Sequence, residues 1–565
     1  RLRGDPPAAL ARCAAGICLG LGLAAPLLIP TAITMLDSQR PRLPLEFLQQ
    51  TYREFLATSW PTFVFPDAWG TPVNHFALVR IPSGGNFIYP ELVAFCGVVP
   101  LLLAGVAATR SGLGRTCFWT AVVLLILPAT PLYGLLYPLP GFNRVIATRI
   151  LFLFGFFISL AGGFGLDALR GRSARAVGIL ALLLAVGLAF GVARVQRLPE
   201  ASVEEWMARG AVRLPDRDLF LDDASYRAAV RAGFRRNYAW TNPSVWLPLM
   251  ALALAAAALA SQRRSLLLAL AAVELMGFAW RFNPAVDRRL VYPVTPPLEF
   301  LRQNAGLDRV LGLSTVKPNS LLPLQLQDVG GYDSFYPRST ALTMSQLLLG
   351  RVDPGRFLPA QVFGFRRTSP LVDLLGVRYV VAYPQDELPG YRLVLQAPLK
   401  IYENPNRIPR AFVVGPHRLV AGPAEAAALL DAGQVDPRQV VLLEEDPGVL
   451  RDGSGSAEIV HYGLNRVRLD ARTSDPAWLV FTDAFAPGWR ALVDGRPARI
   501  WRADGMFRAV ELPEGSSRVE FVYIPPSLGV GLWLGLASLV GILVAATRKA
   551  TSSEVAGPEE GSVTP

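Results

Sequence analysis

Apolar residues form long uncharged runs in the first half of the chain, and the charged residues lie in the short segments between them. Each run is close to the ~20 residues that an α-helix needs to cross the hydrocarbon core of a bilayer. The pattern predicts eight membrane spans, at approximately 8–34, 91–109, 116–137, 148–168, 176–193, 245–260, 265–281 and 527–546. Pro26, Pro128 and Pro131 lie inside these runs, where neighbouring helices can satisfy the freed carbonyl groups.

The pattern changes between residues 282 and 526, where short β-branched or aromatic runs are bounded by Gly, Pro and Asp. Such runs predict β-strands, which we expect at 377–383, 391–397, 410–415, 440–445, 466–471, 478–484 and 518–524. Segment 423–433 predicts a helix, and Asp494-Gly495 predicts a two-residue hairpin turn. We therefore expect an α+β region over 282–456 and a β-rich, sandwich-like domain over 457–525.

Short basic loops indicate the orientation of the spans. The loops 110–115, 170–175 and 261–264 and the tail 547–549 all fall on one side of an eight-span arrangement. The positive-inside rule assigns that side to the cytoplasm.

The sequence thus predicts a polytopic α-helical protein of the cytoplasmic (inner) membrane with a large extracytoplasmic α+β and β-sandwich-like domain. The membrane region would cover 1–281 with about seven spans and with outward loops at 35–90 and 194–244. A C-terminal span at 526–546 would precede a disordered cytoplasmic tail at 547–565.

Composition excludes several other classes of protein. The chain is 52% hydrophobic and carries a net charge of +11, but its arginines are scattered and not gathered into a stripe, so we expect no nucleic-acid partner. The four cysteines lie in or beside apolar runs, which leaves the outward domain without a disulfide framework. The three histidines of the chain are too far apart in sequence for a zinc site, and we expect no metal-ligand motif.

Arg144 and Arg149, in the segment NRVIATRI, stand at the outer entry of the fourth predicted span. The two guanidinium groups either extend to the interface as ordinary flanking charges or bind a lipid phosphate through bidentate hydrogen bonds. An outward location would make a polyprenyl phosphate the natural ligand, because nucleotide sugars and ATP are absent there.

Three titratable side chains, Asp67, His75 and Glu91, belong to an aromatic- and proline-rich outward segment. Each could act as a general base or help to hold a cation, and each could equally be a structural contact. Glu274, inside the seventh predicted span, marks either a functional site or a pairing with a polar group on a neighbouring helix.

Two segments of the outward domain could bind a sugar. Trp489, with Asp483, Asp494 and Arg502, could stack on a sugar ring and hydrogen-bond its hydroxyls, or these residues could serve turns and the core. The segment 328–338, DVGGYDSFYPR, is either a sugar-recognition loop or a glycine turn with aromatic packing.

Several segments, in this order, resemble the bacterial YfhO-type membrane proteins. They are YPELVAFCGVVPLLLAG (89–105), FNRVIATRILFLFGFFISLAGGFGLDAL (142–169), LLGVRYVV (374–381), IYENPNRIPRAFVV (401–414), PGWRALVDGRPARI (487–500) and FRAVELPEGSSRVEFVYIPPSLGVGLWLGL (507–536).

The resemblance implies a GT-C-like glycosyltransferase of the hexosyltransferase class. Such an enzyme transfers a sugar from a polyprenyl-phosphate carrier to a cell-surface polymer or glycolipid on the outer face of the cytoplasmic membrane. The resemblance leaves the cofactor unknown, with a divalent cation as one option. The alternative is a non-catalytic, membrane-anchored binding or scaffold protein for cell-envelope polysaccharide.

Roles for individual residues follow from the resemblance and the candidates above. We expect the donor lipid phosphate to be bound by Arg144, Arg149, Asn143, Glu91 and His75. We expect the acceptor to be bound by Trp489, Asp494, Asp328 and Tyr332. The chain begins with Arg1, so we expect it to be the later part of a longer protein whose catalytic acidic residue lies upstream of Arg1.

Overall fold

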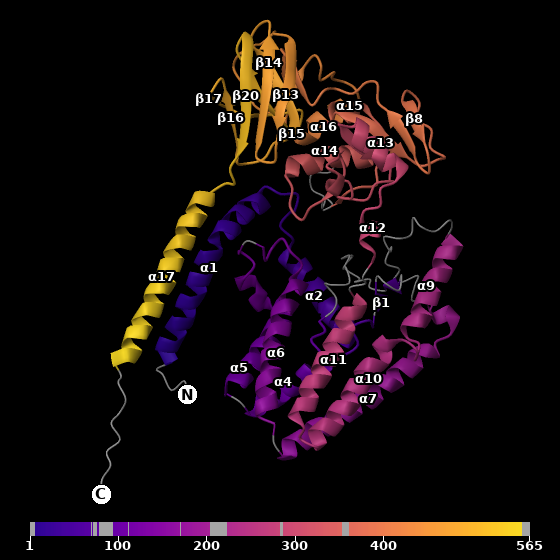
Figure 1. The fold of residues 1–565 in the computed structure, drawn as a ribbon, viewed down its shortest axis with the longest axis vertical. Coiled ribbons are helices and arrows are strands. Elements are labelled where there is room, and N and C mark those ends of the chain that lie inside the picture. Colours follow the sequence, from indigo (N-terminus) through magenta and orange to yellow (C-terminus); the bar gives the residue numbers. More distant parts are fainter. Residues whose placement is uncertain are drawn as a thin grey trace. The chain divides into compact units, whose positions relative to one another are not determined.

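The computed structural model divides the chain into two compact units (Figure 1). One unit, the sheet unit, consists of Arg1–Pro41 and Asp287–Pro565, and the other, the helical unit, consists of Arg42–Val286. The structure describes residues 6–68, 70–71, 76–77, 94–110, 112–139, 141–169, 171–203, 223–282, 286–352 and 361–555.

The helical unit is built from α-helices with short 3₁₀ turns between them. The α-helices are α2 (Leu45–Ser59), α4 (Val98–Arg110), α5 (Gly112–Ile126), α6 (Leu151–Asp167), α7 (Gly171–Gln196), α9 (Asp223–Asn237), α10 (Pro243–Ala260) and α11 (Arg264–Phe282). The 3₁₀ turns are η1 (Trp60–Phe63), η3 (Leu127–Ala129), η4 (Pro131–Leu135) and η5 (Ala147–Ile150), and β1 (Gly70–Thr71) pairs with β2 (Phe76–Ala77). The loops expected at 35–90 and 194–244 therefore contain α2 and α9.

Six helical segments in the described residues are long and apolar enough to cross a membrane. They are Ala14–Leu36, Gly112–Ala129, Ala147–Asp167, Ala174–Gln196, Pro243–Ala260 and Leu528–Thr547. These segments and the strands described below are those of a polytopic membrane protein with a sheet domain. The side of the membrane on which that domain lies stays a prediction.

The structure differs from the predicted spans at two places. The span expected at 116–137 is not one α-helix, because α5 ends at Ile126 and the chain continues in 3₁₀ turns that begin next to Pro128 and Pro131. Proline cannot donate to the helical ladder and disfavours helix in the residue before it. The span expected at 91–109 yields α4 with 13 residues, and residues 91–93 lie outside the described part of the chain. The helix expected at 265–281 is present as α11, although it is not among the six segments.

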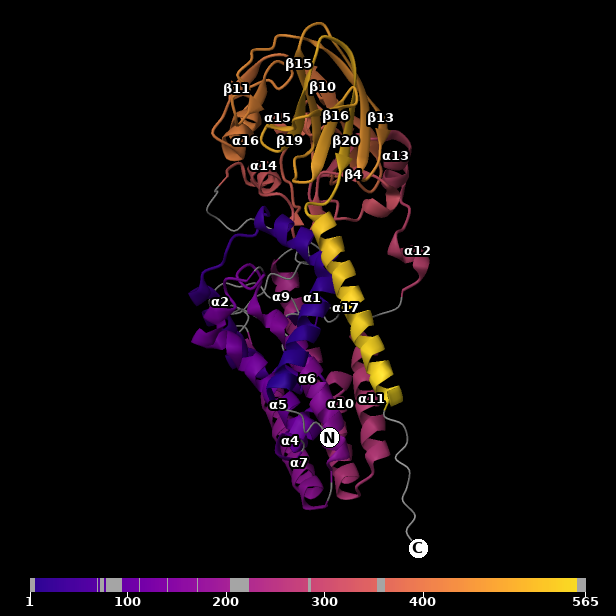
Figure 2. The same cartoon turned by 90° about the vertical axis from the view of Figure 1, so that its left-hand side faces the viewer.

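The sheet unit contains the first and last described helices, α1 (Pro6–Leu36) and α17 (Leu528–Val555), which pack side by side (Figure 2). α1 continues through Pro26 and Pro30 without a break. Glycines permit the close approach: a Cβ atom on Gly531 would lie 2.7 Å from the carbonyl oxygen of Ala25, and one on Gly535 would lie 3.3 Å from the Pro26 ring. Gly531 and Gly535 form a GxxxG spacing, which is typical of helix pairs in membranes. Helix α17 runs to Val555, beyond the point where a disordered tail was expected.

Three larger sheets make up the rest of the sheet unit. The mixed sheet has the strand order β4-β3-β7-β9-β8, the central sheet β10-β15-β19-β18-β12-β11 and the outer sheet β13-β14-β20-β16-β17. A small pair joins β5 to β6. The strands are β3 (Arg309–Gly312), β4 (Gln327–Asp328), β5 (Gly331–Tyr332), β6 (Gln361–Val362), β7 (Val377–Ala382), β8 (Arg392–Gln396), β9 (Lys400–Glu403), β10 (Ala411–Val414), β11 (His417–Leu419), β12 (Val441–Leu443), β13 (Gly455–Tyr462), β14 (Arg466–Thr473), β15 (Ala477–Ala484), β16 (Trp489–Val493), β17 (Arg496–Ala498), β18 (Trp501–Ala503), β19 (Phe507–Leu512) and β20 (Gly515–Tyr523).

Short helices accompany these sheets. They are α12 (Arg288–Val291), α13 (Pro296–Asn304), α14 (Arg338–Leu349), α15 (Pro370–Leu374) and α16 (Pro423–Asp431), with the 3₁₀ turn η7 (Leu322–Leu324). The predicted strands and the predicted helix at 423–433 are all present in the structure.

The central sheet is buried on both faces. On β15, Leu479 and Phe481 pack against the outer sheet, while Trp478 and Val480 face a core shared with the mixed sheet and the helices α14 and α16. A strand covered on both faces is apolar throughout and does not alternate, which explains the run WLVF in this strand. Strand β14 alternates between exposed and buried residues because only one of its faces meets the core.

The sandwich formed by the central and outer sheets includes β10, β11 and β12 from the region expected as a separate α+β domain. Structurally, therefore, the chain is not divided between residues 456 and 457. Sequence periodicity identifies strands but not their partners, and so it could not show that strands from both regions share one sheet.

Candidate functional site

One end of the sandwich gathers several polar and aromatic side chains directly beside the start of α17. Strand β20 ends there at Tyr523, whose N–H donates to the Asn465 carbonyl at 2.9 Å. The next N–H, of Ile524, donates to the Gly488 carbonyl at 3.0 Å. We call this end, where the 463–465 hairpin, the 486–488 turn and residues 524–527 meet, the α17 end of the sandwich.

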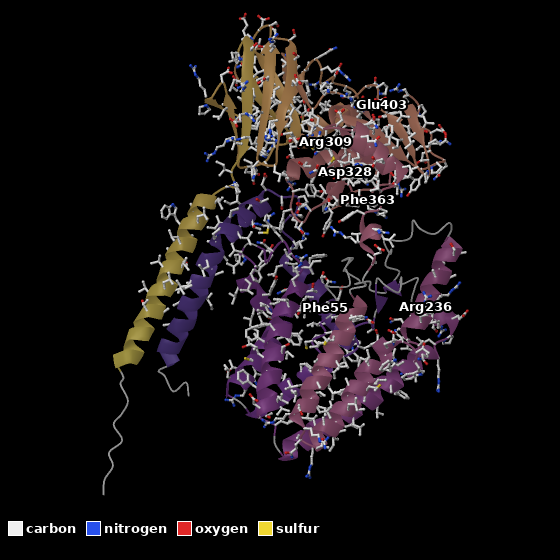
Figure 3. All side chains as sticks on the ribbon, in the orientation of Figure 1. Phe55, Arg236, Arg309, Asp328, Phe363 and Glu403 are labelled. Atoms are coloured by element: carbon white, nitrogen blue, oxygen red, sulfur yellow. The ribbon has the colours of Figure 1, made fainter. Side chains whose placement is uncertain are left out.

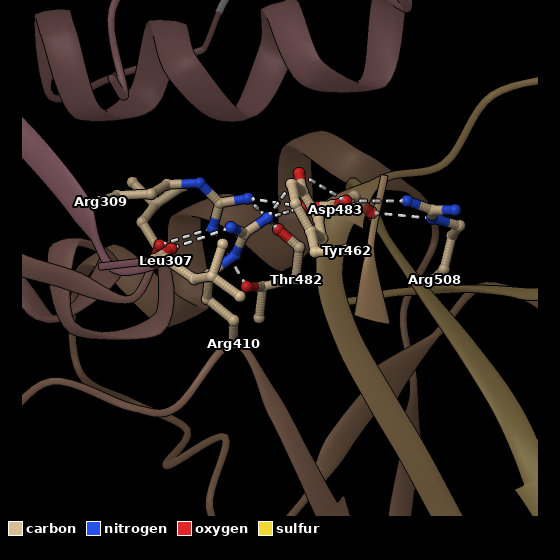
Figure 4. A network of polar contacts seen from close by, with 8 residues as sticks. Leu307, Arg309, Arg410, Tyr462, Thr482, Asp483 and Arg508 are labelled. Atoms are coloured by element: carbon tan, nitrogen blue, oxygen red, sulfur yellow. Dashed lines mark hydrogen bonds and ion pairs between the residues drawn. The ribbon is translucent and has the colours of Figure 1, made fainter. Parts of the chain in front are cut away.

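Asp483, near the end of β15, is the centre of a buried ionic cluster (Figure 4). Arg309 Nη2 donates to Asp483 Oδ1 at 3.0 Å, and Arg508 Nη2 donates to Asp483 Oδ2 at 3.1 Å. Arg410 also donates to Asp483 Oδ1, and the Tyr462 hydroxyl donates to Oδ2 at 3.3 Å. We call these five residues the arginine cluster.

Backbone carbonyls and aromatic rings add further contacts to the guanidinium groups, while Arg410 Nε and Arg508 Nη1 are buried without a hydrogen-bond partner among the described residues. Arg309 donates to the carbonyls of Leu375 and Thr482, both at 2.6 Å, and Arg410 donates to the Leu307 carbonyl at 2.9 Å. The guanidinium carbon of Arg508 lies 3.9 Å from the centre of the Trp489 ring, and that of Arg410 lies 4.6 Å from the Tyr462 ring. Such cation–π contacts stabilise a guanidinium that has been removed from water.

The charges of the cluster persist at neutral pH. Burial raises the pKa of Asp483, but the nearby guanidiniums of Arg410, Arg309 and Arg508 outweigh burial, so the pKa lies below its ordinary value. Burial lowers the pKa of Arg309 and of Arg508 to about 10, which leaves both protonated. A carboxylate with a lowered pKa is a weak proton acceptor, so Asp483 is a poor general base.

The arginine cluster joins three sheets at one point, because Arg309 belongs to the mixed sheet, Asp483 and Arg508 to the central sheet, and Tyr462 to the outer sheet. Arg508 and Arg410 are almost fully enclosed, with side chains 1% and 2% exposed. The arginine cluster is therefore a structural junction that fixes the α17 end of the sandwich.

Trp489, a predicted acceptor-binding residue, lies at this junction. Arg508 covers its ring, and the centre of the Tyr523 ring lies 5.3 Å away. The side chain is half-buried and packs against the core between the two sheets. These contacts favour the interpretation of Trp489 as part of the core, and its role in sugar binding stays a prediction.

Asp494, the second predicted acceptor residue, forms the hairpin turn that the sequence indicates. Strands β16 and β17 pair Val493 with Arg496 across Asp494-Gly495, which have φ angles of 50° and 76°. Asp494 Oδ1 accepts a hydrogen bond from the Arg518 N–H at 2.8 Å. The carboxylate thus extends the pairing of β16 with β20.

Asp328 and Tyr332 lie in the 328–338 segment, where Asp328 ends β4 of the mixed sheet and Tyr332 ends β5 of the β5–β6 pair. Figure 3 labels Asp328 and Arg309, which belong to the neighbouring strands β4 and β3. Burial raises the pKa of Asp328 to about 6, and the Gly330 N–H donates to its Oδ1 at 2.9 Å. Tyr332 is 45% exposed. Among the described residues, no hydrogen bond, ion pair or ring contact joins these two side chains to Trp489 or Asp494.

The predicted donor site falls in the helical unit. Asn143 is buried and donates from Nδ2 to the Tyr137 carbonyl at 2.9 Å, while its own carbonyl accepts from the Leu43 N–H at 2.8 Å. Asn143 therefore shapes the turn that precedes η5 and α6. Arg144 is half-buried, and Arg149 is exposed within η5, two residues before the first residue of α6.

Two other predicted donor residues, His75 and Glu91, lie outside the described residues. Asp67 is described and buried, and it accepts a hydrogen bond from the Ser244 hydroxyl. Asn237 donates from Nδ2 to the Asp67 carbonyl at 2.7 Å. For Asp67 these contacts favour the structural alternative.

Glu274 of α11 caps the N-terminus of α4. Its carboxylate accepts from the Val98 N–H at 2.9 Å and from the Val99 N–H at 3.3 Å. The first N–H groups of a helix lack partners within the helix, and a negative charge there also interacts favourably with the helix dipole. The predicted pairing with a neighbouring helix is present, but its partner is the backbone and not a polar side chain.

No group of three or more His, Cys, Asp or Glu side chains suited to a metal ion occurs among the described residues.

Comparisons with known proteins point to one family. Residues 454–535 match the model of a family described as bacterial membrane protein YfhO. A stretch of 129 residues is 22% identical to the uncharacterized protein YfhO of Bacillus subtilis (strain 168) and covers 22% of this chain and 15% of that protein. No solved structure matches the chain.

Proposed function

The match over residues 454–535 supports membership of the chain in the YfhO family of bacterial membrane proteins, and from that premise we propose a glycosyltransferase-like membrane protein. It would transfer a sugar from a polyprenyl-phosphate carrier to a cell-surface polymer or glycolipid on the outer face of the cytoplasmic membrane.

The observation that carries this proposal is the position of the family match. It covers β13 to β20 and the first part of α17, which is the segment where the outer sheet joins a membrane-length helix. A sheet domain attached to several membrane helices suits a substrate that is itself anchored in the bilayer and an acceptor that is polar. This arrangement supports a lipid-linked donor.

On the donor side we propose Arg149, with Arg144, as the phosphate-binding residues. Arg149 is exposed in the turn before α6, and a guanidinium offers a bidentate donor pair to phosphate oxygens. His75 and Glu91 stay predictions. On the acceptor side we propose Asp328, whose side chain is partly exposed, as a binding residue for sugar hydroxyls.

The test compares Arg149→Ala with Arg115→Ala in full-length protein reconstituted into vesicles. Arg115 is a matched control because it is also an exposed arginine of the helical unit, in the first turn of α5. The vesicles receive a polyprenyl-phosphate hexose and a cell-envelope fraction as the acceptor source, and the release of polyprenyl phosphate is measured.

Loss of a charge-assisted hydrogen bond to phosphate should reduce the release by roughly 10-fold to 100-fold in Arg149→Ala, with little change in Arg115→Ala. No release by the unmodified protein from any carrier would contradict the transferase. If the protein instead retains envelope polysaccharide in a manner that depends on Trp489, the scaffold alternative is correct.

A further inference from the structure

The linker between the sandwich and α17 is short and folded. Tyr523 ends β20 and Leu528 begins α17, so only residues 524–527 lie between them, and four residues span at most ~14 Å. The Leu528 N–H donates to the Pro525 carbonyl at 3.2 Å, and the Gly531 N–H donates to the Ser527 carbonyl at 3.1 Å. The α17 end of the sandwich is therefore held close to the first turn of a membrane-length helix.

A second connection, through α1, restrains the sheet unit at the segment that leads into α14. After α1 ends at Leu36, the Gln39 N–H donates to the Tyr336 carbonyl at 3.1 Å, and the Arg338 N–H donates to the Asp37 carbonyl at 3.0 Å. Because two helices hold the domain, its orientation on them is more restricted than a single flexible tether would allow.

The apolar surface of α1 extends past the start of α17. The two helices are antiparallel, since Ala25 lies against Gly531 and Gly22 lies against Ser538. By this register Leu528 lies opposite about residue 28, so residues 29–36 of α1 continue beyond the start of α17, and Leu28, just before this stretch, and Leu36, at its end, are exposed. A bilayer that covers these side chains would reach the level of the linker.

The α17 end exposes large apolar side chains at that level. Leu464, at the tip of the hairpin between β13 and β14, is 96% exposed, and Ile524 is 43% exposed. The Tyr523–Asn465 hydrogen bond brings the hairpin tip next to the linker. Leucine at the tip of a surface hairpin gains nothing from packing within the domain.

Two arginines accompany this apolar tip. Val522 of β20 pairs with Arg466 of β14 on one side and with Arg490 of β16 on the other. All three side chains project from the outer face of the sheet. Arg466 forms an ion pair with Glu520 at 2.9 Å, while no partner of Arg490 is found among the described residues. Cationic side chains that flank exposed apolar ones are typical of segments that lie in the interface of an anionic membrane.

We propose that the α17 end of the sandwich is a membrane-binding surface. Leu464 and Ile524 enter the boundary between headgroups and acyl chains, and Arg490, together with Arg466, faces anionic headgroups. The occupant is the anionic phospholipid surface into which α17 and α1 are inserted. A soluble protein partner is disfavoured because the covalent linker already holds this surface within reach of the bilayer. The inference does not depend on the proposed sugar transfer.

The test measures how deeply a label at the hairpin tip lies in lipid. The four native cysteines are replaced by serine or alanine in the full chain, and a nitroxide is attached to Leu464→Cys. The protein is reconstituted into vesicles of phosphatidylethanolamine and phosphatidylglycerol, and collision rates with oxygen and with a water-soluble nickel complex are recorded. Leu450→Cys is the matched control, since Leu450 is 84% exposed and precedes the start of β13, at the opposite end of the sandwich.

We expect the label at residue 464 to collide with the nickel complex several-fold less, and with oxygen more, than the label at residue 450. Equal access of the nickel complex to both labels would overturn the proposal. Protection of residue 464 from both reagents would also overturn it, because that result indicates contact with protein. Arg490→Gln should make the label at residue 464 lie less deeply in anionic vesicles. An unchanged depth would show that Arg490 does not contact anionic headgroups.

Discussion

Asp504 makes the free energy of unfolding of the sheet unit depend on pH, and the surroundings of its carboxyl group determine the size and sign of this dependence. The residue lies in the turn between β18 and β19 and is fully buried. Its Oδ1 accepts a hydrogen bond from the Leu442 N–H at 2.9 Å, whereas Oδ2 is buried without a hydrogen-bond partner among the described residues. Burial raises the pKa of Asp504 to about 7.

The sign of the effect follows from proton binding. In the unfolded chain the carboxyl loses its proton near pH 4, while in the folded chain it keeps the proton up to about pH 7. Between these values the folded state binds more protons, so the free energy of unfolding falls as the pH rises. The slope is about 1.4 kcal/mol per pH unit, and the loss over the whole interval is about 4 kcal/mol.

Asp504→Asn removes this dependence and keeps an oxygen that accepts from Leu442. The variant leaves its amide N–H₂ without a partner, which costs about 1–3 kcal/mol at every pH. We therefore expect the difference in unfolding free energy, variant minus unmodified protein, to increase by about 1.4 kcal/mol per unit between pH 5 and pH 7 and then to level off.

Thermal and denaturant unfolding of the full chain in detergent, followed by tryptophan fluorescence, provides the measurement. Trp478 and Trp501 belong to the same core as Ala503, next to Asp504, and report on this region. Asp436→Asn is the control, since Asp436 also accepts a backbone N–H, from Arg438 at 3.0 Å, but its side chain is 41% exposed. A difference for Asp504→Asn that stays constant with pH would refute the reasoning.

Three further predictions concern other contacts. Asp483→Asn leaves the guanidiniums of the arginine cluster without their carboxylate, and we expect a loss of about 3–5 kcal/mol in the stability of the sheet unit, measured by the same unfolding assay; a loss below ~1 kcal/mol would contradict a buried ionic junction. Gly531→Leu should separate α1 from α17 and abolish disulfide crosslinking between cysteines placed on the two helices. Gly529 faces open space, so Gly529→Leu should leave the crosslinking intact. Equal crosslinking in both variants would rule out the glycine contact. Glu274→Ala leaves the Val98 N–H unpaired and should lower the melting temperature in detergent, whereas Glu274→Gln keeps an acceptor and should restore most of it; equal losses would show that the charge matters more than the hydrogen bonds.

Much of the sheet unit could be predicted from sequence because strand signals are local. The run WLVF of β15 and the alternation of β14 identify strands, and Asp494-Gly495 identifies the hairpin turn. The end of α5 was mispredicted because hydropathy continues through Pro128 while the hydrogen-bond ladder does not.

The arginine cluster could not be predicted, because Arg309, Arg410 and Arg508 lie far apart in the chain and meet only when three sheets assemble. One signal was present: each of these arginines, like Asp483, stands beside or within an apolar strand, where an unpaired charge would be costly. Such a signal identifies the members of a buried ionic cluster but not their pairing. The partner of Glu274 was equally hidden, because residues 94–97 before α4 include none of the Ser, Thr, Asp or Asn side chains that usually mark a helix N-terminus.

The pairing of α1 with α17 determines when α1 can reach its final contacts during synthesis. Gly22 and its contact Ser538 lie at opposite ends of the described sequence, and the whole helical unit, Arg42–Val286, is synthesised between them. At a translation rate of ~5–20 residues per second, α1 waits roughly 25–100 s for its partner. During that time the face of α1 that includes Gly22 must be tolerated by lipid or covered by an insertion factor, so α1 reaches its contact with α17 only after the helical unit has been made.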